Sequence, residues 1–414
     1  MKVDAFQKQI IRELTVDVSK SQLYRAKNKA KEMIEGDHFV MGLLAGCGPM
    51  IGLDGAFLKG LYGGQILSAI GVDGNNNMFP IAIAVVEAET KESWTWFLNI
   101  LLEDIGSVEE RGWTFISDRQ KGLVETFKEL MPNAKHRFCL RHLYANYRKK
   151  FRGLDKGAHK WLKDIPAEQW CRSHFSSRSK YDYLVNNLSE SFNNYILEAR
   201  DKQIISMLEW IRRKVMNMFQ IKRMGMEKYN QAICPRIMGK LDVMKKDSKD
   251  SFAHFCGEYK FEVDCHDTTY TVDLKETTCR CRQWDLIGIP CKHACAAIGL
   301  NKQKVEEHVH PCYSRDTYLG VYQHMIQPIP GKHDWVKSNN EEVLPPFMRR
   351  PSGKPKKVRR KAAEEAEDTR AGLSRAGRYM PCSKCLQKGH NLRSCKNPIH
   401  PNSKLLKKRN PSQS

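Results

Sequence analysis

The chain has 414 residues, and 69 Lys and Arg outnumber 47 Asp and Glu, which gives a net charge of +22. No stretch approaches the run of about 20 apolar residues that a membrane-spanning helix needs, and the first residues are too polar for a secretory signal peptide. We therefore expect an intracellular protein without a membrane partner. Its 14 cysteines should stay reduced and act as metal ligands rather than as disulfides.

The positive charge is concentrated in residues 347–414, which contain 19 Lys and Arg against 4 Asp and Glu and so carry +15 of the total. Basic side chains that neutralise phosphates release counterions, so this segment predicts a nucleic-acid partner; a solubilising disordered tail is the alternative. The run "KPKKVRRK" is also typical of a nuclear import signal. The predicted nucleic-acid-binding residues are Lys354, Lys356, Lys357, Arg359, Arg360, Lys361, Lys384, Lys388 and Arg393.

In chain order, residues 1–44 are polar and helix-prone, and three apolar runs then predict strands, with a hairpin turn at Asp73 and Gly74 between the second and the third. Amphipathic helices alternate with shorter strands after them. The expected elements are strands at 50–60, 64–74 and 78–89, a helix at 92–106, a strand at 113–117, a helix at 121–131 and a short strand at 136–140. The order β-β-β-α-β-α-β is that of an RNase H-like core, an α/β fold.

Helical patterns dominate from about residue 144 to 244, and residues 258–300 change to alternating strands followed by a cysteine cluster. The cluster "CRCRQWDLIGIPCKH" supplies Cys279, Cys281, Cys291 and His293. Three thiolates and an imidazole match a closed tetrahedral zinc site with a structural role. The strands "KFEVDC" and "TYTVDL" should present the first ligand pair, and a helix should carry the second, in a small ββα module.

A second cluster near the end of the chain, "CSKCLQKGHNLRSC", supplies Cys382, Cys385, His390 and Cys395. This C-x2-C-x4-H-x4-C spacing is that of a zinc knuckle, a motif associated with single-stranded nucleic acid, including RNA. The sequence therefore predicts two structural zinc ions. The second is expected in a disordered basic tail.

Three carboxylates, those of Asp54, Asp118 and Glu190, can be interpreted either as structural caps and turn residues or as ligands of a catalytic metal ion. Asp118 follows a strand and could cap the next helix, Asp54 lies in an Asp-Gly turn signal, and Glu190 has capping-box spacing from Asn187. In an RNase H-like core, however, the first and fourth strands are neighbours, so Asp54 and Asp118 would lie together. A later helix could then bring Glu190 to them, and bound divalent cations would offset the mutual repulsion of the three carboxylates.

The segments "IGLDGAFLKG", "ISDRQKGL", "CLRHLYANYRKKF" and "NNLSESFN" resemble the plant Mutator-like (MULE, MuDR) transposases. "CRCRQWDLIGIPCKH" resembles the SWIM zinc finger that follows the transposase domain in that family. The resemblance covers roughly residues 45–335 and, with the terminal knuckle, most of the chain.

This resemblance implies a DDE-type active site formed by Asp54, Asp118 and Glu190 with Mg²⁺ or Mn²⁺. The family's C-x-x-H element falls on Cys139 and His142, which would support the active site or contact DNA. The implied reaction is in-line displacement, in which a phosphodiester at a transposon end is hydrolysed and the freed 3′ hydroxyl is joined to target DNA. The implied location is the nucleus and the implied partner is DNA, with a homo-oligomer as a further option.

Alternatives stay open at this point. The segment between the C-x-x-H element and "WL…W" is shorter than the family pattern, which favours a truncated remnant or a domesticated DNA-binding transcriptional regulator without catalysis, whereas intact carboxylates favour the enzyme. A purely protein-binding SWIM adaptor fits the charge of the tail poorly. The predicted domains are a helical N-terminal segment (1–44), an RNase H-like transposase domain with a helical insertion (45–200), a helical connector (201–255), a SWIM zinc-finger region (256–325), a basic linker (326–378), a CCHC zinc knuckle (379–400) and a basic tail (401–414).

Overall fold

The computed structural model describes residues 37–60, 63–151, 156–324, 326, 328, 382–387, 392–401 and 403. The chain divides into two units, residues 1–360 and residues 361–414, and each is described by itself. Among the described residues, no helix is both long and apolar enough to cross a membrane.

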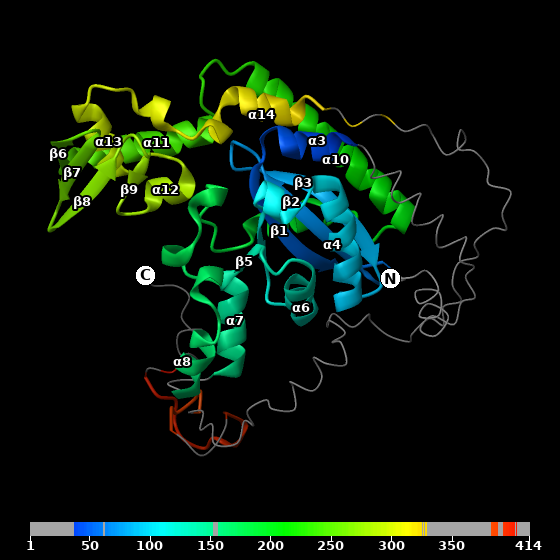
Figure 1. Cartoon of the computed structure of the whole chain (residues 1–414). Helices are drawn as coiled ribbons and strands as arrows, with labels where there is room; N and C mark the ends of the chain where they lie inside the picture. Colours follow the sequence, from blue (N-terminus) through cyan, green and yellow to red (C-terminus); the bar gives the residue numbers. More distant parts are fainter. Residues whose placement is uncertain are drawn as a thin grey trace, which may run out of the picture. The chain divides into compact units, whose positions relative to one another are not determined.

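The described part of residues 37–324 contains two β-sheets, each with α-helices packed against it (Figure 1). The strands are β1 (Gly48–Phe57), β2 (Gln65–Val72), β3 (Met78–Val86), β4 (Thr114–Ser117), β5 (Lys135–Phe138), β6 (Ser251–Gly257), β7 (Lys260–Cys265), β8 (Thr268–Asp273) and β9 (Thr278–Cys279). The α-helices are α3 (Asp37–Gly46), α4 (Lys91–Ile105), α5 (Val108–Arg111), α6 (Lys121–Leu130), α7 (Leu140–Lys150), α8 (Lys156–Lys163), α9 (Asn187–Tyr195), α10 (Ile204–Glu227), α11 (Pro235–Asp247), α12 (Gln283–Ile287), α13 (Lys292–Leu300) and α14 (Arg315–Tyr322).

The first sheet has five strands in the order β3-β2-β1-β4-β5. Strands β1, β2 and β3 form the predicted antiparallel meander, and β4 lies parallel to both β1 and β5. The predicted hairpin turn is confirmed: Asp73 Oδ1 accepts the backbone N–H groups of Asn75 and Asn77 at 2.9 and 2.8 Å. Every residue of β2 is buried, which agrees with its uninterrupted apolar sequence. The sequence thus predicted a mixed α/β architecture correctly.

Helix α4 begins at a Thr90 cap and buries the apolar face that its 3.6-residue periodicity predicts. Helix α9 packs against β1, β2 and β3. Gly52 in β1 makes this approach feasible, because a Cβ atom there would lie 2.5 Å from Asn186 Oδ1 and 2.8 Å from Ser189 Oγ. The side chains of β1 that share the direction of Gly52 therefore point towards α9.

The second sheet is antiparallel, with the order β6-β7-β8-β9, and α13 packs against it. Phe261, Val263 and Val272 from the sheet and Ile298 from α13 form part of its separate apolar core. Strands β7 and β8 and helix α13 agree with the sequence prediction, whereas β6 was not predicted. This module contacts the preceding segment, where Lys180 Nζ donates to the carbonyl of Asp285 at 3.1 Å.

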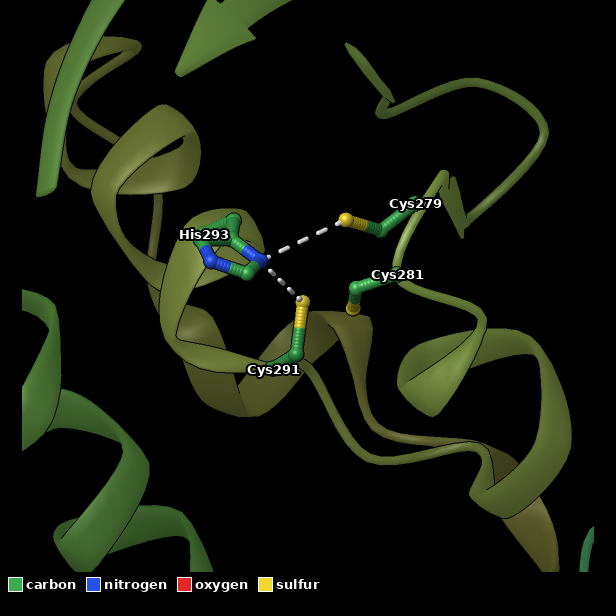
Figure 2. Close-up of side chains that lie close together, drawn as sticks. All are labelled: Cys279, Cys281, Cys291 and His293. Carbon is green, nitrogen blue, oxygen red and sulfur yellow. Dashed lines mark hydrogen bonds between the residues drawn. The ribbon is translucent and has the colours of Figure 1, made fainter. Parts of the chain in front are cut away.

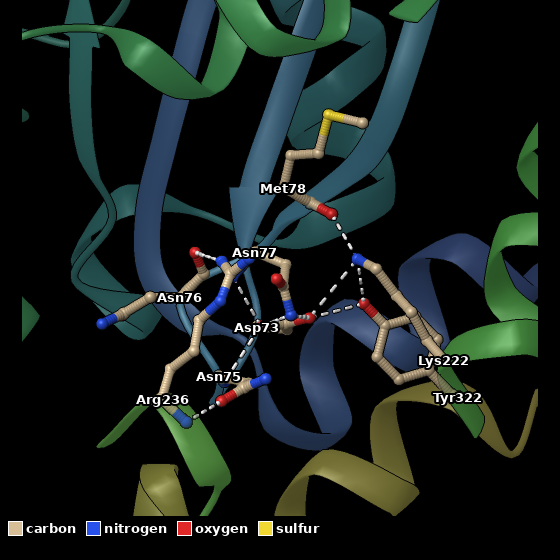
Figure 3. A network of polar contacts seen from close by, with 8 residues as sticks. All are labelled: Asp73, Asn75, Asn76, Asn77, Met78, Lys222, Arg236 and Tyr322. Carbon is tan, nitrogen blue, oxygen red and sulfur yellow. Dashed lines mark hydrogen bonds and ion pairs between the residues drawn. The ribbon is translucent and has the colours of Figure 1, made fainter. Parts of the chain in front are cut away.

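Helix α14 follows this module and packs against α3 and α10 of the first core. Its Tyr322 hydroxyl donates to the fully buried Asp73 at 2.7 Å. Lys222 of α10 also reaches this cluster, where its ammonium donates to the Met78 carbonyl at 2.9 Å and lies 3.5 Å from Asp73 Oδ2 (Figure 3). Asn75 in the same turn accepts the backbone N–H of Arg236 at the start of α11. One hairpin turn therefore connects three helices that come much later in the chain.

Candidate functional site

Asp54 and Asp118 lie at equivalent positions on neighbouring parallel strands. Gly52 of β1 pairs with Ile116 of β4, and each aspartate comes two residues later in its own chain segment. Because the carboxyl ends of parallel strands meet at one edge of a sheet, the two carboxylates are brought to the same place. The neighbouring first and fourth strands were expected from the sequence, and the structure has them.

The surroundings of Asp54 disfavour its ionisation when no cation is present. Burial raises the pKa of its carboxyl to about 8, and the negative charges of Asp118 and Glu89 contribute to the same shift. Asn193 of α9 donates its amide to Asp54 Oδ2 at 2.7 Å, and the Gly55 N–H donates to Oδ1 at 3.0 Å. The carboxyl is thus held in a fixed position.

The structure does not support the simple structural roles of these acids. Asp54 lies inside β1 and pairs with Ser68, so it is not part of a turn. Helix α6 is capped by Gln120, whose side chain accepts the N–H of Leu123 at 2.7 Å, while Asp118 Oδ1 accepts the N–H of Gln120 at 3.3 Å. Helix α9 has Asn186, not Asn187, as its N-cap residue, and this residue makes no side-chain capping hydrogen bond. Glu190 is therefore not part of a capping box.

Glu190 of α9 occupies a different position from the one expected. It forms an ion pair with the guanidinium of Arg141 in α7, which also donates to Asn187 Oδ1 at 3.3 Å. In the described part of the chain, the oxygens of Asp54, Asp118 and Glu190 do not all lie within 4.8 Å of one another. The face of α9 that carries Glu190 nevertheless meets Asp54 through Asn193. The sequence carried no sign of the Arg141 contact.

Cys139 and His142 form a group with Glu190. The Cys139 sulfur, a ring nitrogen of His142 and a carboxylate oxygen of Glu190 all lie within 4.8 Å of one another. Burial opposes ionisation of the thiol, but its hydrogen bond with His142 lowers the pKa of Cys139. The same hydrogen bond raises the pKa of His142 to about 9, and the charges of Asp118 and Asp54 act in the same direction. His142 therefore connects the two groups of side chains electrostatically.

The four residues of the first cysteine cluster meet as predicted. The donor atoms of Cys279, Cys281, Cys291 and His293 all lie within 4.8 Å of one another, and Figure 2 shows the four side chains converging. The first two residues come from β9 and the turn after it, and the other two from the start of α13. His293 Nδ1 lies 3.7 Å from the Cys279 sulfur and 3.9 Å from the Cys291 sulfur. Hydrogen bonding from Cys279 lowers the pKa of Cys281, so one thiol is readily ionised. Three of these residues are buried and Cys281 is half-buried, and three sulfurs with one nitrogen are a donor set that suits Zn²⁺.

The terminal cluster is described only in part. The sulfurs of Cys382, Cys385 and Cys395 lie within 4.8 Å of one another, while His390 lies outside the described residues. Lys384, predicted to bind nucleic acid, donates its ammonium to the Cys395 carbonyl at 3.4 Å. Of the other residues predicted to bind nucleic acid, Arg393 has a side chain that lies outside the described part of the structure. The remaining ones lie outside it entirely, namely Lys354, Lys356, Lys357, Arg359, Arg360, Lys361 and Lys388.

Two segments of the first unit match the models of known protein families. Residues 50–146 match the MULE transposase domain, a segment that contains Asp54, Asp118, Cys139 and His142. Residues 270–301 match the SWIM zinc finger and contain its four zinc-ligand candidates. The chain therefore combines a segment similar to the MULE transposase domain with a later segment similar to the SWIM zinc finger. Glu190 lies after the end of the matched transposase segment.

The chain is also similar to a curated protein, FAR1-related sequence 6 of Arabidopsis thaliana, with which it is 24% identical over 160 residues. The match covers 32% of this chain and 22% of the relative. The chain thus spans about a fifth of the length of the curated relative it matches.

Proposed function

We propose that the protein is a nuclear, DNA-binding transposase-derived enzyme that cleaves phosphodiesters by DDE-type, metal-dependent hydrolysis and strand transfer. In this proposal the five-stranded sheet is an RNase H-like core. The observation that supports it best is the matched register of Asp54 and Asp118, two residues beyond the Gly52–Ile116 pair on adjacent parallel strands. Such a pair of carboxylates at a sheet edge suits the binding of a hard divalent cation.

The donor chemistry of this edge fits Mg²⁺ or Mn²⁺, because its donors are carboxylate oxygens. The raised pKa of Asp54 fits as well, since a nearby cation would favour the ionised form. When bound, divalent ions at such sites stabilise negative charge on the attacking and leaving oxygens of an in-line displacement. The roles of the chain's own residues are to orient these carboxylates: Asn193 holds Asp54, and the Gln120 N–H holds Asp118.

Glu190 is proposed as the third acid, although it contacts Arg141. A side chain on the face of α9 that already contacts Asp54 needs only a change of rotamer and release from Arg141 to approach the pair. The same ion pair favours a second candidate function, a DNA-binding regulator without catalysis, because a Glu190 held by Arg141 leaves only two of the three acids together.

The zinc modules are proposed as structural and nucleic-acid-binding parts. The SWIM cluster would hold one structural Zn²⁺, and the terminal CCHC cluster a second in a knuckle that binds single-stranded DNA or RNA. The basic segment around residues 354–361 would bind phosphates and direct nuclear import. DNA partners would be transposon ends for the enzyme or genomic sites for the regulator.

The test is a nicking assay with the purified full chain, supercoiled plasmid and Mn²⁺. We expect nicked circles from the parent and only background from Asp54→Asn and Asp118→Asn, with DNA affinity retained in both variants by fluorescence anisotropy. Asp242→Asn is the matched control, because this aspartate is exposed on α11 and remote in sequence from both acids.

Nicking that survives in Asp54→Asn would assign the activity to a contaminating nuclease and overturn the catalytic proposal. An inactive parent that binds DNA as tightly as its variants would favour the regulator instead. Loss of both DNA binding and nicking in the parent would reject both candidate functions.

A further inference from the structure

We propose a third metal site in this protein, in which Cys139, His142 and Glu190 bind a transition-metal ion of the Zn²⁺ class. The site is separate from both cysteine clusters and does not depend on the proposed hydrolysis. Its three donors are a sulfur, a nitrogen and an oxygen that already lie within 4.8 Å of one another. Zn²⁺ holds such donors at bond lengths of about 2.0–2.3 Å, so the side chains need to move inwards only slightly to bind it.

The local sequence explains why Cys139 and His142 converge. Cys139 is the N-cap residue of α7 and His142 follows three positions later, so both lie on one side of the first helical turn. The backbone N–H of Cys139 donates to the carbonyl of Ser117 at 2.7 Å, which fixes the start of α7 to the end of β4, next to Asp118. The pair is therefore placed by backbone contacts and not by a mobile loop.

Two features of these residues point to a missing ligand. The His142 Nδ1 atom is excluded from solvent and has no hydrogen-bond partner. A buried ring nitrogen without a partner is energetically costly, and coordination of an ion would offset that cost. The Cys139 side chain is fully buried, and the backbone N–H of Asn186 donates to its sulfur at 3.4 Å. Such a donor stabilises a thiolate, the form of cysteine that binds metals.

The third donor comes from a different part of the chain. Glu190 is delivered by α9, and its contact with the exposed Arg141 neutralises the carboxylate where no metal is present. A carboxylate has two oxygens, so it can keep this ion pair and still supply one oxygen to a cation. Three protein ligands leave the fourth tetrahedral position to water or to another oxygen ligand.

The experiment measures zinc per chain by elemental analysis of the full-length protein after dialysis against a trace of Zn²⁺. We expect Cys139→Ser, His142→Gln and Glu190→Gln each to contain one zinc fewer than the parent. Cys234→Ser is the matched control, because Cys234 is likewise a fully buried N-cap cysteine without a side-chain cap, at the start of α11. It should retain the full zinc content, as should Arg141→Gln, which removes the cation but none of the donors.

Cobalt substitution provides a second measurement that does not depend on the zinc count. The thiolate-to-cobalt charge-transfer absorption of the parent should exceed that of Cys139→Ser, while His142→Gln tests the site without removing a buried sulfur. Equal zinc content and equal cobalt spectra in the parent and all three donor variants would overturn the proposal. Circular dichroism identifies any variant that fails to fold, and the two remaining donor variants then decide the outcome. These experiments measure zinc content and cobalt absorption and not nicking activity. A negative result for the proposed hydrolysis would therefore not contradict the third metal site.

Discussion

At the scale of single residues, the placement of Asp54 and Asp118 follows from the strand pattern of the sequence. The order of the apolar runs predicted that β1 and β4 would be neighbours, and the parallel register brings the two positions together. The position of Glu190 could not be predicted in the same way. Its partner Arg141 lies 49 residues away, and ion pairs between two helix surfaces leave no periodic signal in a sequence.

The raised pKa of Asp54 predicts how stability depends on pH without divalent cations. Its folded value of about 8 exceeds its ordinary value of 3.8, so the folded state holds an extra proton between these limits. The free energy of unfolding should therefore fall as pH rises, by about 2 kcal/mol between pH 6 and 8. Asp54→Asn should remove this contribution. Urea unfolding of both proteins in buffer freed of Mg²⁺ and Mn²⁺ measures it, and parallel pH profiles would contradict the assignment.

At the scale of elements, the sequence predicted strands with clear alternation and missed those without it. Strand β7 alternates exposed and buried residues throughout and was predicted. Strand β6 exposes both Phe252 and Phe255 at the edge of its sheet, so its pattern has no clean period. The return of α14 to the first core was also not foreseen, because an amphipathic helix does not encode which surface it packs on.

The turn at Asp73 should be a strong determinant of stability, since it joins α10 and α14 to the sheet. Asp73→Ala would leave the buried ammonium of Lys222 without its ion-pair partner, so we expect a loss of about 3–5 kcal/mol in urea unfolding. The double variant Asp73→Asn with Lys222→Met should recover much of that loss. A loss below about 1 kcal/mol in the single variant would show that this ion pair is not needed.

The SWIM module should depend on its metal. Cys291→Ser removes a fully buried ligand, and a structural zinc site contributes its binding free energy to folding. We expect one zinc fewer by elemental analysis and rapid proteolysis within residues 251–300, while the first core stays resistant. Cys256→Ser, an exposed cysteine outside the described clusters, is the control. Unchanged proteolysis in Cys291→Ser would contradict a structural role for the cluster.

At the scale of the whole molecule, the charge distribution assigns nucleic-acid affinity mainly to residues 347–414. Removing this segment should weaken DNA binding and flatten its dependence on salt, because each lost phosphate contact lowers the logarithmic slope by about 0.9 on duplex DNA. Anisotropy titrations at several salt concentrations give the slope. The same slope in the full and shortened chains would place the binding surface elsewhere.

The central claim is that Asp54 and Asp118 together bind a divalent cation, and thermal unfolding with increasing Mn²⁺ tests it most directly. At 100 times its dissociation constant, a ligand of the folded state adds about 2.7 kcal/mol of stability, so the parent's Tm should rise with Mn²⁺ until the site is saturated. Above pH 8, where Asp54 is ionised, Asp118→Asn should melt above the parent without Mn²⁺, because a repulsive charge beside Asp54 is gone, and it should not respond to the ion. A rise in Tm of equal size in the parent and in Asp118→Asn, or no rise in the parent, would contradict the account.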